Sequence, residues 1–453
     1  MNAPTHPATT PWPAGPVPRE VLQRLLTDRA VTDIMLAVPD LQGRLMGKLF
    51  NAAVFLERMT DGAEMCSYIL ATDVHMTPLD GFDFTGWDQG FGDFLVLPDL
   101  DHIRMLPHQP GTALVFGTPV HDDTTPVTVA PRQLLATQLD RLHALGYAVK
   151  VGVETEFVLH SDGPAGQAPV WTANLDYALQ QPPQIGDFFR HLARALSDAG
   201  IDYESIKTEA APGQAEVALA YTDAATACDD YAIFRRIVSN LAQRHDLTAV
   251  FMAAPETRVG SGLHLHVSLW DERGESAFAH RRGAGLPPVM AHAIAGLLSA
   301  LPHMAPLYAP TVNSYKRYQP HSFAPTRYNW GFDHRGCAVR VAGHGAGAHL
   351  EVRLAGADAS AYVALAAYLA AITHGIEEKL TLRPACDSDA YQEQHSVPLY
   401  DDLAQALAYF EHSTVAHLLL GKDVVRHYAH AAQAELDYHR RHVTDLERQR
   451  GIR

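Results

Sequence analysis

Polar side chains able to bind a metal ion or an anion recur at every second position in four segments of the sequence. Each is flanked by apolar residues, as in the stretch Leu263-His264-Leu265-His266. Successive side chains of a β-strand point to opposite faces, so the alternation predicts strands with one polar and one apolar face. A solvated sheet face would explain any one segment taken alone. The polar residues are Glu154, Glu156, Glu216, His264, His266, Ser268, His349, Glu351 and Arg353.

Taken together, these segments predict a dense acidic cluster, which Glu209 joins from just before the turn formers Ala211-Pro212-Gly213. Carboxylates placed so close repel one another, and such repulsion is tolerated chiefly where divalent cations neutralise it. Carboxylate oxygens with few nitrogens and no thiolates suit Mg²⁺ or Mn²⁺ better than structural Zn²⁺. The candidate metal ligands are Glu154, Glu156, Glu209, Glu216, His264 and Glu351.

Basic side chains that would face this cluster gather in residues 313–341. Arginines opposite metal-bound carboxylates suit phosphoryl transfer, because its transition state spreads charge over phosphate oxygens that the protein must position and neutralise. The alternative is a basic, solvated loop. No Walker-type loop or dinucleotide-binding glycine fingerprint of the usual spacing occurs, so a nucleotide would depend on metals, arginines and a stacking aromatic ring. The basic residues are Lys316, Arg317, Arg327, Arg335, Arg340 and, further on, Arg353.

Composition narrows the class of protein. The chain has 453 residues, enough for two or three domains, and 47% of them are hydrophobic, which excludes a mostly disordered chain. The formal net charge of −16 argues against binding to nucleic acid or an anionic membrane, which depends on clustered Lys and Arg. The four cysteines have no zinc-knuckle or redox-pair spacing. Without a secretory signal or an apolar run long enough to span a bilayer, we expect a cytoplasmic protein.

The predicted elements fall into three parts. Residues 1–18 are rich in proline and predict a disordered extension. Residues 19–117 predict a small sheet-rich domain with a helix over 19–28 and a hairpin over 33–50. In residues 118–453, strands alternate with helices. The expected helices are 131–145, 187–199, 231–244, 288–301, 359–376 and 424–447.

Five stretches resemble, in order, the signature motifs of the glutamine synthetase family. They are residues 153–157, 209–216, 260–266, 313–317 and 350–353. The resemblance implies an α+β fold with a small N-terminal β-grasp domain and a larger catalytic domain, in which helices flank a curved antiparallel sheet. It also implies a homo-dodecamer of two stacked hexameric rings. The active sites would lie between neighbouring subunits, each completed by the N-terminal domain of the next.

The resemblance assigns the polar residues to ligands. The first Mg²⁺ or Mn²⁺ ion of at least two would be bound by Glu156, Glu209 and Glu216. The second would be bound by Glu154, His264 and Glu351. For ATP, the co-substrate, the implied contacts are His266, Ser268, a stacking Tyr221, and Arg335 and Arg340 at the phosphates. For glutamate they are Gly260, Arg317 and Arg353.

The implied reaction begins with transfer of phosphate from ATP to the γ-carboxylate of glutamate, and an amine then attacks the γ-glutamyl phosphate. Members that use ammonia carry a glutamate in a flap that closes the site, whereas this sequence has Phe323 there. A phenyl ring cannot accept a proton, but it can line a pocket for an organic amine. The stretch therefore resembles the branch that couples glutamate to polyamines, ethanolamine, alkylamines or aniline.

The amine's proton acceptor is left between two residues. Asp40 resembles an aspartate that the N-terminal domain lends to the neighbouring amine site, and Glu209 is the other candidate. Val259 and His349 replace an asparagine and an arginine usual in the family. Two other functions therefore stay open: an ordinary ammonia-using glutamine synthetase, and a non-catalytic assembly or nucleotide-sensing protein.

Overall fold

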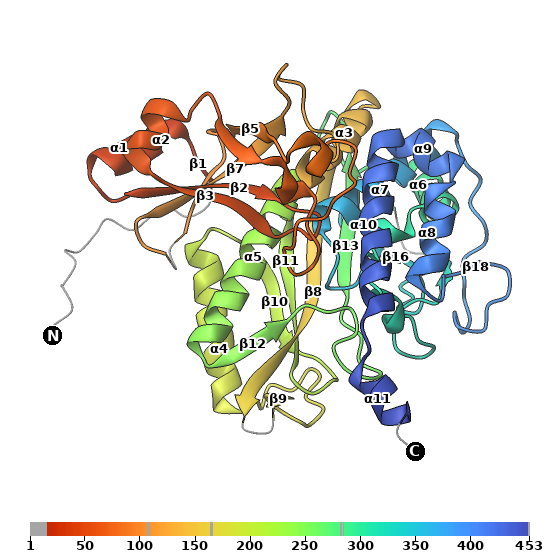
Figure 1. Ribbon diagram of the computed structural model, residues 1–453. Helices are drawn as coiled ribbons and strands as arrows, with labels where there is room; N and C mark the ends of the chain where they lie inside the picture. Colours follow the sequence, from red (N-terminus) through yellow and green to blue (C-terminus); the bar gives the residue numbers. More distant parts are fainter. Residues whose placement is uncertain (1–15, 107–108, 164–165, 281–282, 284, 452–453) are drawn as a thin grey trace.

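The computed structural model describes residues 16–106, 109–163, 166–280, 283 and 285–451 (Figure 1). Its N-terminal part is a seven-stranded sheet that carries two short α-helices, α1 (Arg19–Thr27) and α2 (Ala52–Arg58). The order along the sheet is β1 (Pro16–Val17), β6 (Ile103–Met105), β7 (Thr112–Val120), β2 (Asp33–Pro39) and β3 (Leu45–Asn51). Off this path, β5 (Asp93–Pro98) pairs with both β7 and β4 (Ala63–Cys66).

Two of the expected boundaries differ from the observed elements. Of the predicted extension, residues 1–15 lie outside the described residues, but Val17 is buried and pairs with Ile103. The division expected between residues 117 and 118 falls inside β7, which stays paired with β5 as far as Val120. The hairpin of β2 and β3 forms as predicted, with Pro39 opposite Leu45 at its turn.

The C-terminal part is built on a nine-stranded sheet. It is antiparallel throughout except for one parallel pair, β15 with β16. The strand order is β10 (Tyr203–Thr208), β11 (Gln214–Asp223), β8 (Ala148–Gly163), β13 (Leu263–Trp270), β17 (His349–Val352), β16 (Val339–Ala342) and β15 (Trp330–Phe332). Strands β9 (Gly166–Pro169) and β12 (Leu247–Val250) also pair with the long β8, and β14 (Arg327–Tyr328) pairs separately with β18 (Val397–Pro398).

In the ribbon view (Figure 1), α4 and α5 lie to the left, beside β10 to β12, and the C-terminal helices lie to the right. The α-helices of this part are α3 (Pro131–Ala144), α4 (Pro183–Asp198), α5 (Ala224–Arg244), α6 (Pro288–Ala300), α7 (Ala361–Glu377), α8 (Leu403–Glu411), α9 (Thr414–Leu420), α10 (Lys422–Arg441) and α11 (Asp445–Gly451). The short 3₁₀ turns are η1 (Ser67–Leu70), η2 (Trp87–Gln89), η3 (Leu301–His303), η4 (Ala305–Leu307) and η5 (Ser314–Arg317).

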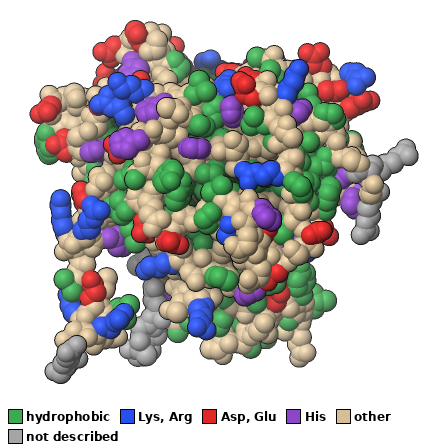
Figure 2. Space-filling view, turned by 90° about the vertical axis from the view of Figure 1, so that its right-hand side faces the viewer, with side chains coloured by type: hydrophobic (Ala, Val, Ile, Leu, Met, Phe, Trp, Pro, Cys, Tyr) green, Lys and Arg blue, Asp and Glu red, His purple; other side chains and the backbone are tan. Residues whose placement is uncertain are grey.

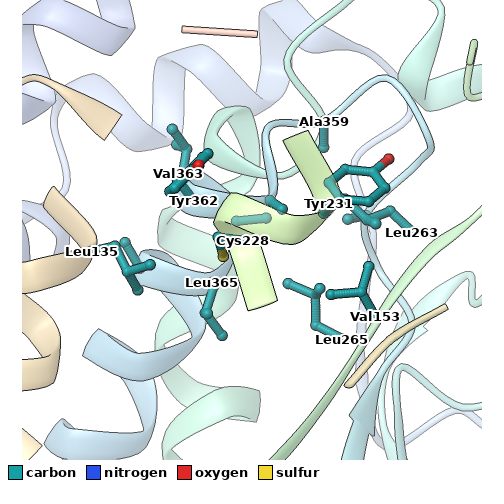
Figure 3. Packing of buried hydrophobic residues seen from close by; sticks show 14 of the residues in the cluster. Leu135, Val153, Cys228, Tyr231, Leu263, Leu265, Ala359, Tyr362, Val363 and Leu365 are labelled. Carbon is teal, nitrogen blue, oxygen red and sulfur yellow. The ribbon is translucent and has the colours of Figure 1, made fainter. Parts of the chain in front are cut away.

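The apolar face of the sheet packs against α5 and α7. Figure 3 shows Val153 of β8 and Leu265 of β13 directed toward Cys228 and Tyr231 of α5, with Leu365 of α7 close by. All five side chains are almost fully buried. Because alternate residues of a strand point to opposite faces, burial of these residues turns their polar neighbours to the other side of the sheet.

The C-terminal helices differ from the single helix expected over residues 424–447. Helix α10 ends at Arg441, and α11 begins after Thr444. Thr444 and Glu447 form a reciprocal capping box, in which the Glu447 carboxylate accepts from the Thr444 amide and Thr444 Oγ1 accepts from the Glu447 amide. Two further helices, α8 and α9, were not expected, although Asp402 and Ser413 cap their N-termini.

The surface seen in Figure 2, on the side of these C-terminal helices, carries acidic and basic side chains interspersed with histidines and apolar groups. No helix among the described residues is long and apolar enough to cross a lipid bilayer.

Candidate active site

The register of the large sheet brings the predicted polar residues to one face. Glu156 of β8 lies opposite Glu216 of β11, and Glu154 of β8 lies opposite His264 of β13. One strand further on, His266 of β13 lies opposite Glu351 of β17, and Arg340 of β16 lies opposite the same Glu351. The neighbouring strands β11, β8, β13, β17 and β16 therefore present a continuous row of acidic, imidazole and guanidinium groups.

The predicted second metal set converges closely. One ligand atom each from Glu154, His264 and Glu351 lies within 4.8 Å of the other two. His264 Nδ1 is 2.7 Å from Glu154 Oε1 and 3.5 Å from Glu351 Oε1. His264 and Glu351 are buried, and Glu154 is partly exposed. Two carboxylates and one imidazole on a rigid sheet fit a divalent cation, and they leave coordination positions open for water or substrate oxygens.

The predicted first metal set is more dispersed. Glu156 Oε2 accepts hydrogen bonds from the Gly262 amide at 3.0 Å and from Gln214 Nε2 at 2.9 Å. Glu209 and Glu216 face the ammonium group of Lys207, which forms a salt bridge with Glu209 and lies 3.8 Å from Glu216 Oε1. The Lys207 ammonium group thus lies between Glu209 and Glu216, which are two of the three proposed ligands of the first metal.

Burial and mutual repulsion raise two of the carboxyl pKa values. Burial, reinforced by the charge of Glu154, raises the pKa of Glu216 to about 10. Burial also raises the pKa of Glu156 above its ordinary value. Like charges placed opposite each other in a sheet destabilise it. A divalent cation would neutralise this mutual repulsion and favour the ionised carboxylates, so the donor set fits a metal site.

Basic groups lower the pKa values of Glu154 and Glu351. Glu351 is buried, but Arg353 and His264 lower its pKa to about 2. Glu154 is partly buried, but its hydrogen bond with His264 and the nearby His266 hold its pKa well below its ordinary value. These two carboxylates are therefore ionised at every physiological pH.

Three arginines are fixed around the cluster. Arg340 Nη1 donates to Glu351 Oε2 at 2.8 Å, and Arg353 forms a salt bridge with Glu351 Oε1. The buried Arg317 is the last residue of η5, donates to the backbone carbonyl of Arg353 at 3.1 Å and lies 3.3 Å from His264 Nε2. Gly262 is needed for this approach, because a Cβ there would lie 2.4 Å from His264 Nε2 and 2.9 Å from Arg317 Nη2.

A cavity of about 500 Å³ adjoins the cluster on the side of His266. Of the predicted ATP contacts, four line it, namely Tyr221, His266, Ser268 and Arg340. The Tyr221 ring is 56% exposed and lies beneath Lys150 Nζ at 5.8 Å. His349, which also lines the cavity, packs against the His266 ring with the centroids 5.1 Å apart. The cavity thus combines an exposed aromatic face with groups that can bind phosphate.

The flap that carries Phe323 meets the cluster through its backbone. The carbonyl of Phe323 accepts a hydrogen bond from Arg353 Nη2 at 3.3 Å, while the phenyl ring is 68% exposed. His321 and Phe323 have φ values of 59° and 62°, in the left-handed region that few residues adopt without external support. The hydrogen bond from Arg353 is one such support.

Other predicted site residues are not part of this cluster. The Asp40 carboxylate is fully buried in its own hairpin, where Arg44 Nε lies 2.7 Å from Oδ2 and the Gln42 and Arg44 amides donate to Oδ1. The resemblance assigns Asp40 to the site of a neighbouring subunit, so its role at an amine site stays a prediction. Arg335 is exposed in the loop between β15 and β16 and is not among the residues that line the cavity. Gly260 contributes its carbonyl, which accepts from Gln214 Nε2 at 2.8 Å.

Sequence reasoning missed two polar residues of the site, Lys207 and Gln214. Lys207 precedes Glu209 by two positions and lies opposite Glu216 in the register, so it shares their face. The same alternation by which the glutamates were found would have found Lys207. Gln214 gave no such signal, because its contact with Glu156 depends on how β11 enters the sheet after the turn.

Comparison with known proteins places this site in context. The family model described as "Glutamine synthetase, catalytic domain" matches residues 128–451. The chain is 39% identical to a gamma-glutamylethanolamide synthetase, GlnA4, of Streptomyces coelicolor, with 96% of each chain covered. It is 32% identical to a glutamate–isopropylamine ligase of a Pseudomonas species, covering 88% of this chain and 90% of that one.

A third relative, the gamma-glutamylputrescine synthetase PuuA of Escherichia coli, is 30% identical over 92% of this chain and 90% of its own. Among solved structures, a GmaS/ADP complex matches with a TM-score of 0.83 and 26% identity, covering 95% of this chain and 99% of that one. The α+β fold class and the resemblance drawn from the five motifs are both confirmed. With a family model matched over residues 128–451 and relatives aligned over nearly its whole length, the chain belongs to the glutamine synthetase family.

Proposed function

We propose that this protein is an ATP-dependent ligase that joins the γ-carboxylate of glutamate to an organic amine. The observation that carries the choice of acceptor is Phe323, whose carbonyl is held by Arg353 while its apolar ring is exposed beside the cluster. No carboxylate stands at this flap position to bind ammonium. Relatives named for ethanolamide, isopropylamine and putrescine products support the same class of acceptor.

The side chains of the cluster have separable tasks. Glu156, Glu209 and Glu216 would hold one Mg²⁺ or Mn²⁺ ion, and Glu154, His264 and Glu351 a second. When bound, these ions supply charge neutralisation for phosphate oxygens. Lys207 holds Glu209 and Glu216 in place beside each other.

The arginines and the cavity position the substrates. Tyr221, His266 and Ser268 bind ATP in the cavity of about 500 Å³, with Arg340 directed at its phosphates. Arg335 is the further phosphate contact and would have to turn inward from its exposed loop. Arg317, Arg353 and the Gly260 segment hold glutamate, so that its γ-carboxylate meets the transferred phosphoryl group in line.

The amine must lose a proton before or during its attack on the γ-glutamyl phosphate. Phe323 cannot accept that proton. Asp40 and Glu209 are the two candidates, and in this chain each carboxylate pairs with a basic side chain, Asp40 with Arg44 and Glu209 with Lys207.

Phosphate release tests the proposal directly. The purified enzyme, with ATP, glutamate and Mg²⁺, is offered ammonia, ethanolamine, isopropylamine, putrescine and aniline in parallel. We expect one of the organic amines to give the highest kcat/KM and ammonia to give a far lower value. Ammonia as the best acceptor would identify an ordinary glutamine synthetase. No release with any amine would identify a non-catalytic assembly or sensor protein.

The assembly is proposed from the resemblance. We propose a cytoplasmic homo-dodecamer of two stacked hexameric rings, in which the N-terminal sheet of one subunit, assigned to residues 19–117, covers the site on the catalytic part, residues 118–453, of the next. The 68% exposure of Phe323 in a single chain suits such a cover. Light scattering of the purified protein measures the mass, and a monomer or dimer would refute the ring assembly.

A further inference from the structure

A second cluster of metal-ligating side chains lies outside the active site. His334 and Cys337 belong to the loop between β15 and β16, and Cys386 comes from the irregular segment between α7 and β18. One ligand atom from each of the three lies within 4.8 Å of the other two. None of the three residues belongs to the carboxylate cluster that carries the proposed reaction.

The donor set differs in kind from that of the active site. Two sulfurs and one imidazole are soft ligands, which select Zn²⁺ rather than Mg²⁺. Tetrahedral zinc with bonds of about 2.0–2.3 Å would need donor spacings of roughly 3.5–3.8 Å, so the three side chains are close to a binding arrangement. Cys337 is buried and Cys386 half-buried, and all four cysteines of the chain are free in the structure.

The imidazole of His334 is already oriented for metal binding. Its Nε2 lies 2.8 Å from the carbonyl of Ser388, so Nε2 carries the proton and donates it. The lone pair of Nδ1 accepts a hydrogen bond from the Gly336 amide at 3.1 Å, and Nδ1 would exchange this bond for one to the metal. Metal-ligating histidines commonly donate their second ring N–H to a carbonyl in this way, which fixes the tautomer and the ring plane.

The backbone around His334, Cys337 and Cys386 lets the three side chains approach one another. A Cβ on Gly331 would come within 2.8 Å of both His334 Cβ and the Cys386 carbonyl, and within 3.3 Å of Cys337 Sγ. The Cys386 amide donates to the Trp330 carbonyl at 2.8 Å, which sets Cys386 beside β15.

We propose that His334, Cys337 and Cys386 bind a zinc ion that fastens the segment around Cys386 to the loop that carries Arg335, with water completing the fourth position. The segment between α7 and β18, residues 378–396, contains no α-helix or strand, and irregular stretches of this length are uncommon in compact domains without a function or an anchor. It reaches the flap as well, because the ring of Tyr391 lies 4.9 Å from that of His321.

Metal content tests the site without reference to activity. The full-length protein, produced with zinc, reduced and passed over a chelating resin, is assayed for zinc by mass spectrometry. We expect about one zinc per chain in the wild type and in the control Cys66→Ser, whose thiol lies outside the cluster. Cys337→Ser and Cys386→Ser should lose it. Zinc retained by both variants, or absent from the wild type, would overturn the proposal.

Cobalt substitution identifies the donor atoms. Co²⁺ added to the zinc-depleted wild type should give the sulfur-to-cobalt charge-transfer absorption and the intense visible bands of a tetrahedral thiolate site, and Cys337→Ser should not. Cobalt in the carboxylate cluster would give no charge-transfer band of this kind. A wild type without this band, or a peptide map with Cys337 and Cys386 joined as a disulfide before reduction, would refute the metal site.

A milder variant guards against loss of folding. His334→Gln removes a ligand at a partly exposed position and should weaken zinc binding by at least about 10–100-fold, while the far-UV circular dichroism is unchanged. Amide hydrogen exchange tests whether zinc fastens the segment to the loop. Amides of residues 383–390 should exchange faster when zinc is removed, and amides of β8 should not. Equal exchange in both states would contradict the fastening role.

Discussion

Arg353 joins the flap to the acidic cluster. Its Nη2 donates to the backbone carbonyl of Phe323 at 3.3 Å, and its Nη1 forms a salt bridge with Glu351. One guanidinium thus spans from a predicted metal ligand to the residue that distinguishes this sequence from ammonia-using members. The hydrogen bond depends on the main chain, so the side chain at position 323 can be changed without breaking it.

Phe323→Glu should shift the preference for the acceptor. The carboxylate would bind ammonium and repel the apolar part of an organic amine, so kcat/KM should rise for ammonia and fall about tenfold or more for the best organic amine, a change of about 1.4 kcal/mol or more. Phe323→Leu is the matched control and should keep the organic amine as the best acceptor. Parallel kinetics with both amines measure the shift, and an unchanged preference in Phe323→Glu would argue against an acceptor site beside the flap.

Glu156→Ala should abolish ligation by removing a ligand of the first metal. Loss of an electrostatic group at a phosphoryl-transfer site costs on the order of 10²–10³-fold or more in kcat. Phosphate release at saturating ATP and glutamate is the measurement. Glu272→Ala, an exposed glutamate in the turn after β13, controls for a general effect of charge. Normal turnover in Glu156→Ala would refute the ligand assignment.

Lys207→Met should lower the Mg²⁺ concentration required for half-maximal activity. The Lys207 ammonium sits between Glu209 and Glu216, and these carboxylates raise its pKa despite partial burial. The cation therefore competes with a metal for the same oxygens, and its removal should tighten metal binding by up to about tenfold, or about 1.4 kcal/mol. Lys48→Met on the N-terminal sheet is the control. A higher Mg²⁺ requirement in Lys207→Met would mean that the lysine assists metal binding.

Acid should weaken the docking of α10 onto the N-terminal part of the chain. His427 is buried against Phe82 and contacts the Leu70 carbonyl through Nε2 at 2.9 Å, and burial lowers its pKa to about 3. In the unfolded chain the imidazole takes up its proton near pH 6.5, so the unfolded state binds more protons between pH 6.5 and 3. Burial of the neutral His427 imidazole therefore has no pH-dependent cost above pH 6.5, and it lowers stability as the pH drops toward 3, by about 2–3 kcal/mol over the first two units.

Thermal midpoints across this pH range test the contribution of His427. His427→Gln, which can still donate to Leu70, should flatten the decline, while His439→Gln, at an exposed position on the same helix, should leave it unchanged. A variant and wild type with parallel pH profiles would show that other groups govern the loss of stability.

The sequence predicted those parts of the site that depend on local alternation. Glu154 and His264 were assigned to a polar face because their neighbours are apolar, and the register of β8 and β13 sets them opposite each other. The assignment of Asp40 stays a prediction, because it concerns the site of a neighbouring subunit, and within one chain its carboxylate pairs with Arg44. The approach of Cys337 to Cys386 could not be foreseen, because only the packing of an irregular segment on β15 brings them together.

Helix ends show the same dependence on local signals. Thr444 and Glu447 form a cap whose spacing is visible in the sequence, yet the apolar periodicity before it favoured one continuous helix. The parallel pairing of β15 with β16 had no such local signal, because it depends on how the chain between them turns back.

The residues proposed for ATP and metal binding stand mostly on strands, whereas Phe323 stands on a loop outside them. A one-residue slip of β13 would turn His264 and His266 to the apolar face of the sheet and its leucines to the polar face, so the strands tolerate little variation. The loop that carries Phe323 has no such constraint on its ring, which projects into solvent. The proposed metal and ATP ligands thus stand mostly on paired strands, while the residue proposed to select the acceptor stands on an irregular loop, where a substitution leaves the strand register undisturbed.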